Sequence, residues 1–88
     1  MTTYKRAVHL MEAELGDELV ALDPAGGQCF GFNSVATSVW HQLTGPQTFE
    51  QLRNALLEEF DVGPEQCGRE LQELLDDLCA RGLITASA

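Results

Sequence analysis

Apolar residues change their spacing near residue 33, and this change divides the chain into two parts. Before it, three short segments have the apolar content and the Gly, Pro and Asp boundaries of strands, over residues 8–15, 18–22 and 28–32. Gly16-Asp17 and the run from Asp23 to Gly27 are turn sequences. Because the intervals between the segments are short, the pattern predicts an antiparallel meander of three strands.

The third predicted strand passes directly into a helix. Phe30 and Phe32 alternate across one glycine, so both rings are expected on the same face of the strand. Asn33 then offers a side-chain oxygen to the open amides of the following helix. The helix is predicted from residue 34 to about residue 44, where a Gly-Pro pair ends it. Its apolar face consists of residues at helical spacing, namely Val35, Ala36, Val39, Trp40 and Leu43.

Two more helices follow. Thr48 and Gln51 have the spacing of a capping box, which predicts a helix start. Pro64 suits the first position of a third helix, which is expected to end at Gly82 before Leu83-Ile84 returns to the core. The predicted fold is therefore α+β, with a three-stranded antiparallel sheet followed by a three-helix bundle in a winged-helix-like arrangement. We expect one domain over residues 1–88, because a chain of this length supports one core.

Charge excludes one function of winged-helix proteins, which often bind DNA. The formal net charge is −9, and phosphate contacts supply most of the affinity for DNA. The third predicted helix has only Arg69 and Arg81 as cations. Its five carboxylates have the spread of a solvated face rather than a metal site; they are Glu65, Glu70, Glu73, Asp76 and Asp77. We expect no nucleic-acid partner and, since no apolar run approaches roughly 20 residues, no membrane span.

The sequence predicts no reaction and no cofactor. Its three cysteines, Cys29, Cys67 and Cys79, are an odd number with no close pair, which does not fit a disulfide framework or a zinc site. We interpret them as reduced thiols of a cytoplasmic protein, since no export signal precedes them. Cys29 with His9 or His41 could form a nucleophile–base pair, but no catalytic motif surrounds these residues.

One alternative is a small acidic carrier protein with a phosphopantetheine arm on Ser34. Asn33-Ser34-Val35 lies at a predicted helix start, and the acidity fits. Carrier proteins, however, resemble Asp-Ser-Leu at this point and are helical from the beginning. Here about a third of the chain is predicted as strand before Ser34, so the carrier protein remains the second choice.

The order and spacing of several short motifs resemble the PqqD-like family over nearly the whole chain. The matching positions are Leu22-Asp23, Gly27, Phe30, Phe32-Asn33, Val39-Trp40, Leu43, Gly45, Thr48, Leu52, Leu56, Phe60-Asp61, Leu71, Leu78 and Gly82-Leu83-Ile84. Ala36 stands where a glycine is common, and Phe32 where a leucine is usual. Within the family, Asn33 and Trp40 make the chain look closest to stand-alone subunits of lasso-peptide pathways.

This resemblance implies a function. Members of the family are peptide chaperones, also called RiPP recognition elements, which bind the leader segment of a ribosomally made precursor peptide and present it to modifying enzymes. In lasso-peptide pathways the partner is a separate leader peptidase, and the subunit itself has no catalytic role. The leader adds as a strand to the third strand of the family fold and lies against the third helix. When this binding mode of the family is transferred to the present sequence, the docking edge consists of Gln28, Cys29, Phe30, Gly31 and Phe32.

The predicted edge has the properties that strand addition requires. It contains none of the Lys or Pro residues that usually protect edge strands, and Gly31 lets another backbone approach closely. Periodicity on the third helix adds four candidate pocket residues, Cys67, Glu70, Leu74 and Asp77. We expect Phe30, Phe32 and Trp40 to be core residues that hold the edge rigid. An open edge also fits either a monomer or a weak homodimer.

Overall fold

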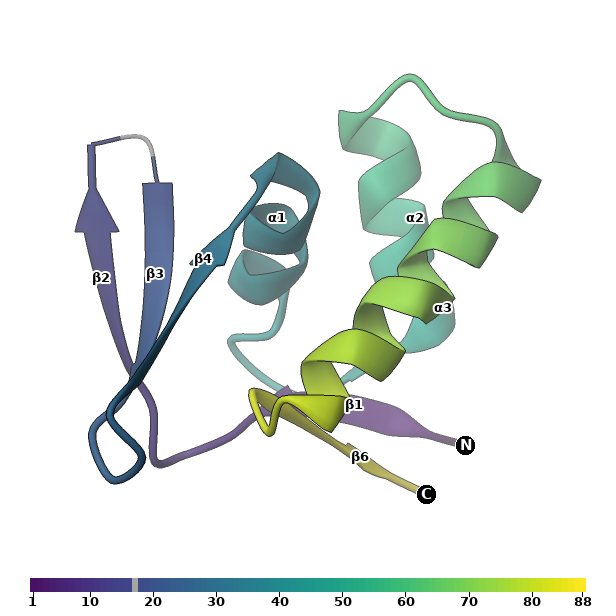
Figure 1. The fold of residues 1–88 in the computed structure, drawn as a ribbon. Helices are drawn as coiled ribbons and strands as arrows, with labels where there is room; N and C mark the ends of the chain where they lie inside the picture. Colours follow the sequence, from purple (N-terminus) through teal and green to yellow (C-terminus); the bar gives the residue numbers. More distant parts are fainter. Residues whose placement is uncertain (17) are drawn as a thin grey trace.

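The computed structural model describes residues 1–16 and 18–88, and its elements form layers on either side of a central helix (Figure 1). The larger sheet lies on one side of α1, and α2 and α3 lie on the other. In chain order the elements are β1 (Thr3–Arg6), β2 (Met11–Leu15), β3 (Glu18–Asp23), β4 (Gln28–Phe32), α1 (Ser34–Gln42), β5 (Gln47–Thr48), α2 (Phe49–Glu59), α3 (Pro64–Ala80) and β6 (Ile84–Ser87). The predicted α+β class is confirmed.

The larger sheet is the predicted meander, with antiparallel strands in the order β2-β3-β4. A tight loop joins β3 to β4, where Gly27 has a φ of +68° and its N–H donates to the carbonyl of Asp23 at 2.8 Å. The strand predicted over residues 8–15 starts only at Met11, and Val8 is 97% exposed. Of the turn predicted at Gly16-Asp17, Gly16 has a φ of +69°, and Asp17 lies outside the described residues.

A second, smaller sheet was not predicted. In it, β1 lies between β5 and β6 and is antiparallel to both. Thr3 is paired with Ser87, so the two ends of the described chain lie side by side (Figure 1). Strands of two to four residues carry too little alternation to be recognised locally, and their partners are far away in sequence. The predicted three-stranded sheet is present, and the smaller sheet is an addition to it.

The helix starts follow the predicted capping signals. Asn33 Oδ1 accepts a hydrogen bond from the N–H of Ala36 at 2.8 Å. Thr48 and Gln51 form the predicted capping box, with reciprocal bonds of 2.8 and 3.2 Å. Pro64 is the first residue of α3, as expected. The first helix, however, ends at Gln42, two residues earlier than the predicted end near residue 44.

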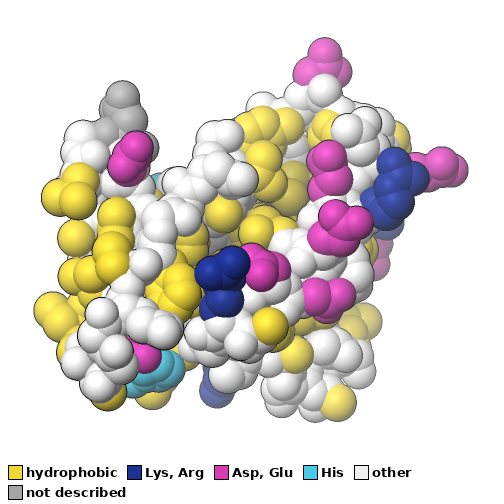
Figure 2. Space-filling view, in the orientation of Figure 1, with side chains coloured by type: hydrophobic (Ala, Val, Ile, Leu, Met, Phe, Trp, Pro, Cys, Tyr) yellow, Lys and Arg dark blue, Asp and Glu magenta, His cyan; other side chains and the backbone are white. Residues whose placement is uncertain are grey.

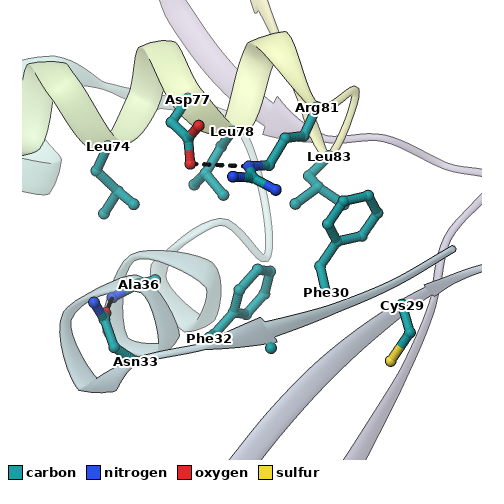
Figure 3. Close-up of a pocket in the computed structure, with 11 residues that line it drawn as sticks. Cys29, Phe30, Phe32, Asn33, Ala36, Leu74, Asp77, Leu78, Arg81 and Leu83 are labelled. Atoms are coloured by element: carbon teal, nitrogen blue, oxygen red, sulfur yellow. Dashed lines mark hydrogen bonds and ion pairs between the residues drawn. The ribbon is translucent and has the colours of Figure 1, made fainter.

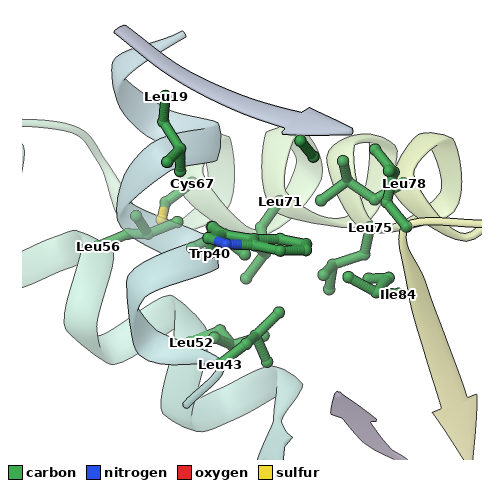
Figure 4. Packing of buried hydrophobic residues seen from close by; sticks show 13 residues of the cluster. Leu19, Trp40, Leu43, Leu52, Leu56, Cys67, Leu71, Leu75, Leu78 and Ile84 are labelled. Carbon is green, nitrogen blue, oxygen red and sulfur yellow. The ribbon is translucent and has the colours of Figure 1, made fainter. Parts of the chain in front are cut away.

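Trp40 lies at the centre of the core, as predicted (Figure 4). Only 2% of it is exposed, and it belongs to one core cluster with leucines of α2 and α3 and with Leu43, the residue that follows α1. Leu83 and Ile84 are also buried, which confirms that the chain returns to the core after α3. Within residues 1–16 and 18–88, no helix has both the length and the apolar content needed to cross a membrane.

Candidate functional site

Among the residues that the structure describes, one edge of β4 has no strand partner, because β4 is the last strand of the larger sheet. A groove of about 280 Å³ separates this strand from α3 (Figure 3). Its lining comes from β4, the start of α1 and the C-terminal half of α3, and consists of Cys29, Phe30, Gly31, Phe32, Asn33, Ala36, Leu74, Asp77, Leu78, Arg81 and Leu83. The groove therefore combines unpaired backbone groups with an apolar wall.

Two aromatic rings form the β4 side of the groove. Phe30 and Phe32 point toward α3, whereas the side chain of Cys29 points to the opposite side of the strand (Figure 3). This follows from strand alternation across Gly31. The ring of Phe32 lies 5.2 Å from that of Trp40, measured between centroids. Both phenylalanines are half-buried and pack against the core without belonging to its buried set, and both also line the groove.

The α3 side of the groove has leucines along most of its length and an ion pair at one end. Leu74 and Leu78 lie one helical turn apart and both line the groove. Beyond them, Arg81 Nε donates to Asp77 Oδ2 at 3.0 Å. The guanidinium carbon of Arg81 also lies 5.9 Å from the centre of the Phe30 ring. Arg81 thus bridges from α3 toward β4 at this end of the groove.

The structure brings six of the nine predicted site residues together and separates three. The six are Cys29, Phe30, Gly31, Phe32, Leu74 and Asp77. Gln28 is exposed at the start of β4 and is not part of the groove lining. Cys67 and Glu70 line a different hollow of about 290 Å³, between α3, α2 and Val35 of α1. Cys67 and Glu70 are separated from the groove because the first half of α3 faces the other helices, and only its second half faces β4.

Several groove residues were not predicted. Leu78 belongs to the buried core, with 3% of it exposed, and it also lines the groove. Arg81 lies four residues after Asp77, so its pairing with that carboxylate was readable from the sequence. Asn33, Ala36 and Leu83 enter the lining through the packing of α1 and α3, for which the sequence carries no local signal.

The thiols have different environments. Burial raises the pKa of the Cys67 thiol. The positive charge of Arg53 partly offsets this rise, and the negative charge of Glu70 adds to it. Burial also raises the pKa of Cys79, with Asp76 contributing in the same direction. Both are therefore protonated and weakly nucleophilic at neutral pH. All three cysteines are free, and Cys29 is exposed.

Cys29 and His41, one of the two pairings that the sequence leaves open, lie on different faces of the sheet. His41 lies on the α1 side of the sheet, with its Nε2 3.9 Å from Oε1 of Glu14. The Cys29 side chain lies on the opposite face of the sheet, because Cys29 pairs with Leu22 and alternates with the inward-pointing Phe30.

Together, the sheet, the helices and the groove define an α+β module with an open strand edge beside a helix wall. Family comparison agrees with this description. The model for coenzyme PQQ synthesis protein D (PqqD) matches residues 18–84, and the chain belongs to this family. Among curated proteins no relative of this sequence was found.

Two solved structures have a very similar fold. One is TbiB1 in complex with the TbiA(beta) leader peptide, at a TM-score of 0.82 and 26% identity, covering 91% of this chain and 93% of that one. The other is lasso peptide synthetase B1 complexed with the leader peptide, at a TM-score of 0.82 and 18% identity, covering 93% and 96%. The second likeness concerns the fold alone. None of these comparisons supports the carrier-protein alternative at Ser34.

Proposed function

We propose that this chain binds the leader segment of a ribosomally synthesised precursor peptide by adding the leader as a strand to β4. The observation that carries the proposal is the free edge of β4 beside the groove that α3 walls. The similarity to TbiB1, which was solved with a leader peptide, supports the same choice of ligand.

The groove supplies both affinity and selectivity for an extended peptide. Unpaired N–H and C=O groups on β4 are ready for main-chain hydrogen bonds. Alternate side chains of an added strand point to one face, so every second leader residue enters the groove between Phe32 and Leu74. Asp77 and Arg81 offer one charge of each sign at its end. Glu70 and Cys67 remain part of the proposal as the lining of the second hollow, although Cys67 is only 3% exposed.

In this proposal the chain acts by holding a peptide and catalyses no step itself. Presentation then requires a separate enzyme, for which we propose a leader peptidase or another modifying enzyme. The free thiols fit the reducing conditions of the cytoplasm. We propose that the working form is a monomer or a weak homodimer, since each copy carries a net charge of −9.

Fluorescence polarisation with a labelled leader tests this function. The probe is a labelled candidate leader peptide, and a scrambled peptide of the same composition is the control. We expect saturable binding of the leader, reversed by unlabelled leader, and none of the scrambled peptide. Equal binding of both peptides would show that no sequence is recognised and would refute the proposal.

A further inference from the structure

The lining of the groove carries a single cationic side chain, and that side chain lies at one end. Among the groove residues that the structure describes, Arg81 is the only cation and Asp77 the only anion. Arg81 extends from α3 toward Phe30 of β4, so its guanidinium lies between the helix and the strand (Figure 3). A peptide strand in the groove therefore meets a cation at the Phe30 end and none beside Phe32.

The backbone that carries Arg81 is held in place by the way α3 ends. Arg81 is the C-cap residue of this helix. Immediately after it, the N–H of Gly82 donates to the carbonyl of Cys79 at 3.0 Å. The N–H of Leu83 donates to the carbonyl of Leu78, also at 3.0 Å. These two bonds form a Schellman motif, in which Gly82 takes a φ of +75°. Since Leu83 is buried, Arg81 cannot shift its backbone without opening the core.

Two contacts orient the side chain of Arg81 and leave most of its donors free. Nε donates to Asp77 Oδ2 at 3.0 Å, and the guanidinium carbon lies 5.9 Å from the centre of the Phe30 ring. Among the described residues, neither Nη group has a hydrogen-bond acceptor, and 52% of the side chain is exposed. A guanidinium binds a carboxylate well through parallel N–H donors. Arg81 is therefore an oriented cation with donors left for a carboxylate.

Stabilisation of α3 accounts for only part of this arrangement. A cation at a helix C-terminus interacts favourably with the helix dipole, and it also pairs with a carboxylate four residues earlier. Neither effect requires contact with another element. Arg81, however, reaches the Phe30 ring across the groove. Its position thus fits a role toward a peptide that occupies the groove.

The apolar part of the groove does not determine the register of an added strand. Phe30 and Phe32 line it two positions apart and are the same residue type. An apolar leader side chain has similar surroundings opposite either ring, and a slip of two residues keeps the same leader side chains on the groove side. Gly31, between the two rings, has no side chain that could distinguish the registers. A charge at one end of the groove removes this ambiguity.

The acidity of the whole chain makes a leader carboxylate selective for Arg81. The net charge is −9, and Figure 2 shows acidic side chains gathered over α3. The exposed carboxylates of this helix outside the groove are Glu65, Glu70, Glu73 and Asp76. A leader carboxylate is repelled along this surface and attracted at Arg81. A leader cation, in contrast, is attracted at many points and specifies no register.

We propose that Arg81 sets the register of the bound leader by pairing with a leader carboxylate opposite Phe30. The recognised leader then carries Asp or Glu at this position and an apolar residue two positions away, between Phe32 and Leu74. This inference rests on the proposed function and names the sequence feature that the groove selects.

The test is a charge scan of the peptide. The probes are labelled copies of a candidate leader peptide in which Glu or Gln replaces each residue in turn, and fluorescence polarisation gives their affinities. Glu and Gln are similar in size, so their affinity ratio at each position reports the effect of charge. The variants of the chain are Arg81→Gln and Arg81→Lys. Arg69→Gln is the matched control, because Arg69 is an exposed cation of the same helix outside the groove lining.

We expect one position at which Glu binds about threefold to tenfold more tightly than Gln. Arg81→Gln should abolish this preference, Arg81→Lys should keep part of it, and Arg69→Gln should leave it unchanged. Salt at about 1 M, where the Debye length is about 3 Å, should also reduce it.

The inference is overturned if no position prefers Glu, or if the preference survives in Arg81→Gln. The second result would leave Arg81 with stabilisation of α3 alone. Loss of the whole preference in Arg81→Lys also overturns it, because contact with Phe30 rather than charge would then be the cause. Failure of the wild-type chain to bind the leader is a separate result, and it refutes the proposed function.

Discussion

Trp40 Nε1 donates a hydrogen bond of 2.6 Å to Oε2 of Glu12, which links the buried centre of α1 to the edge strand β2. Arg6 adds to this link, since its guanidinium carbon lies 4.7 Å from the centre of the indole ring. The Nε of Arg6 also donates to the carbonyl of Trp40 at 3.0 Å. One side chain thus joins the helices, the larger sheet and the smaller sheet.

Trp40 is expected to be the most sensitive position for stability. Trp40→Ala removes the large side chain from a closed core and should lower the free energy of unfolding by about 3–5 kcal/mol. Trp40→Phe keeps most of the packing but loses the donor to Glu12, and we expect a smaller loss of about 1–2 kcal/mol. Urea denaturation followed by circular dichroism measures both. Equal losses for the two variants would show that the hydrogen bond, not the packing, dominates.

Leu74 tests the α3 wall of the groove. Leu74→Glu places a carboxylate where the leader's apolar side chains are expected, so leader affinity should fall by about tenfold or more. Leu57→Glu is the matched control, because Leu57 is also partly buried against the core but lies on α2, outside the groove lining. We expect both variants to lose similar stability and only Leu74→Glu to lose leader binding, as measured by fluorescence polarisation and thermal melting. Equal leader affinity in the two variants would contradict the proposed groove.

The buried thiols make stability depend on alkaline pH. Burial raises the pKa of Cys67 and of Cys79 above the ordinary value of 9.0, so the folded chain holds these protons where the unfolded chain has released them. The free energy of unfolding should therefore be highest below pH 9 and fall as the pH rises above it. Cys67→Ala combined with Cys79→Ala should flatten this part of the profile. An unchanged slope in the double variant would assign it to other groups.

The fold was predictable where the signal is local. Asn33, Thr48 and Pro64 mark helix starts through side-chain or ring chemistry that acts within one turn. The same holds for the hairpin loop, where Gly27 takes a positive φ. The smaller sheet was missed because Thr3 finds its partner at Ser87, and no local pattern encodes that pairing.

The site was predictable on the strand and only partly on the helix. Alternation fixes the direction of Phe30 and Phe32 whatever packs against them. On α3, periodicity defines a stripe but not the point along the helix at which its neighbour changes. Cys67 and Leu74 lie on the same predicted side of α3, yet they line different hollows. The reason is that α2 is shorter than α3 and lies beside Cys67, whereas β4 lies beside Leu74.

The free edge of β4 makes the most direct prediction about the mode of binding. In an antiparallel pair, hydrogen-bonded and non-hydrogen-bonded residues alternate, so only every second amide of β4 is bonded to β3. The other amides face the open edge. In the free protein we therefore expect fast and slow hydrogen exchange to alternate along Gln28–Phe32, and leader binding to slow the fast set selectively. Nuclear magnetic resonance with and without leader measures this.

Two substitutions extend that test to affinity. Where hydrogen exchange places the N–H of Gly31 in the fast set, Gly31→Pro removes one donor of the open edge and obstructs a neighbouring backbone, and we expect it to abolish leader binding while the chain stays folded. Gly31→Ala is the control, because a Cβ at this position meets nothing within 4 Å and the N–H remains. It should therefore bind leader with nearly wild-type affinity. Strand addition at this edge is excluded if leader protects none of the fast amides of β4, or if Gly31→Pro folds and binds leader as tightly as Gly31→Ala.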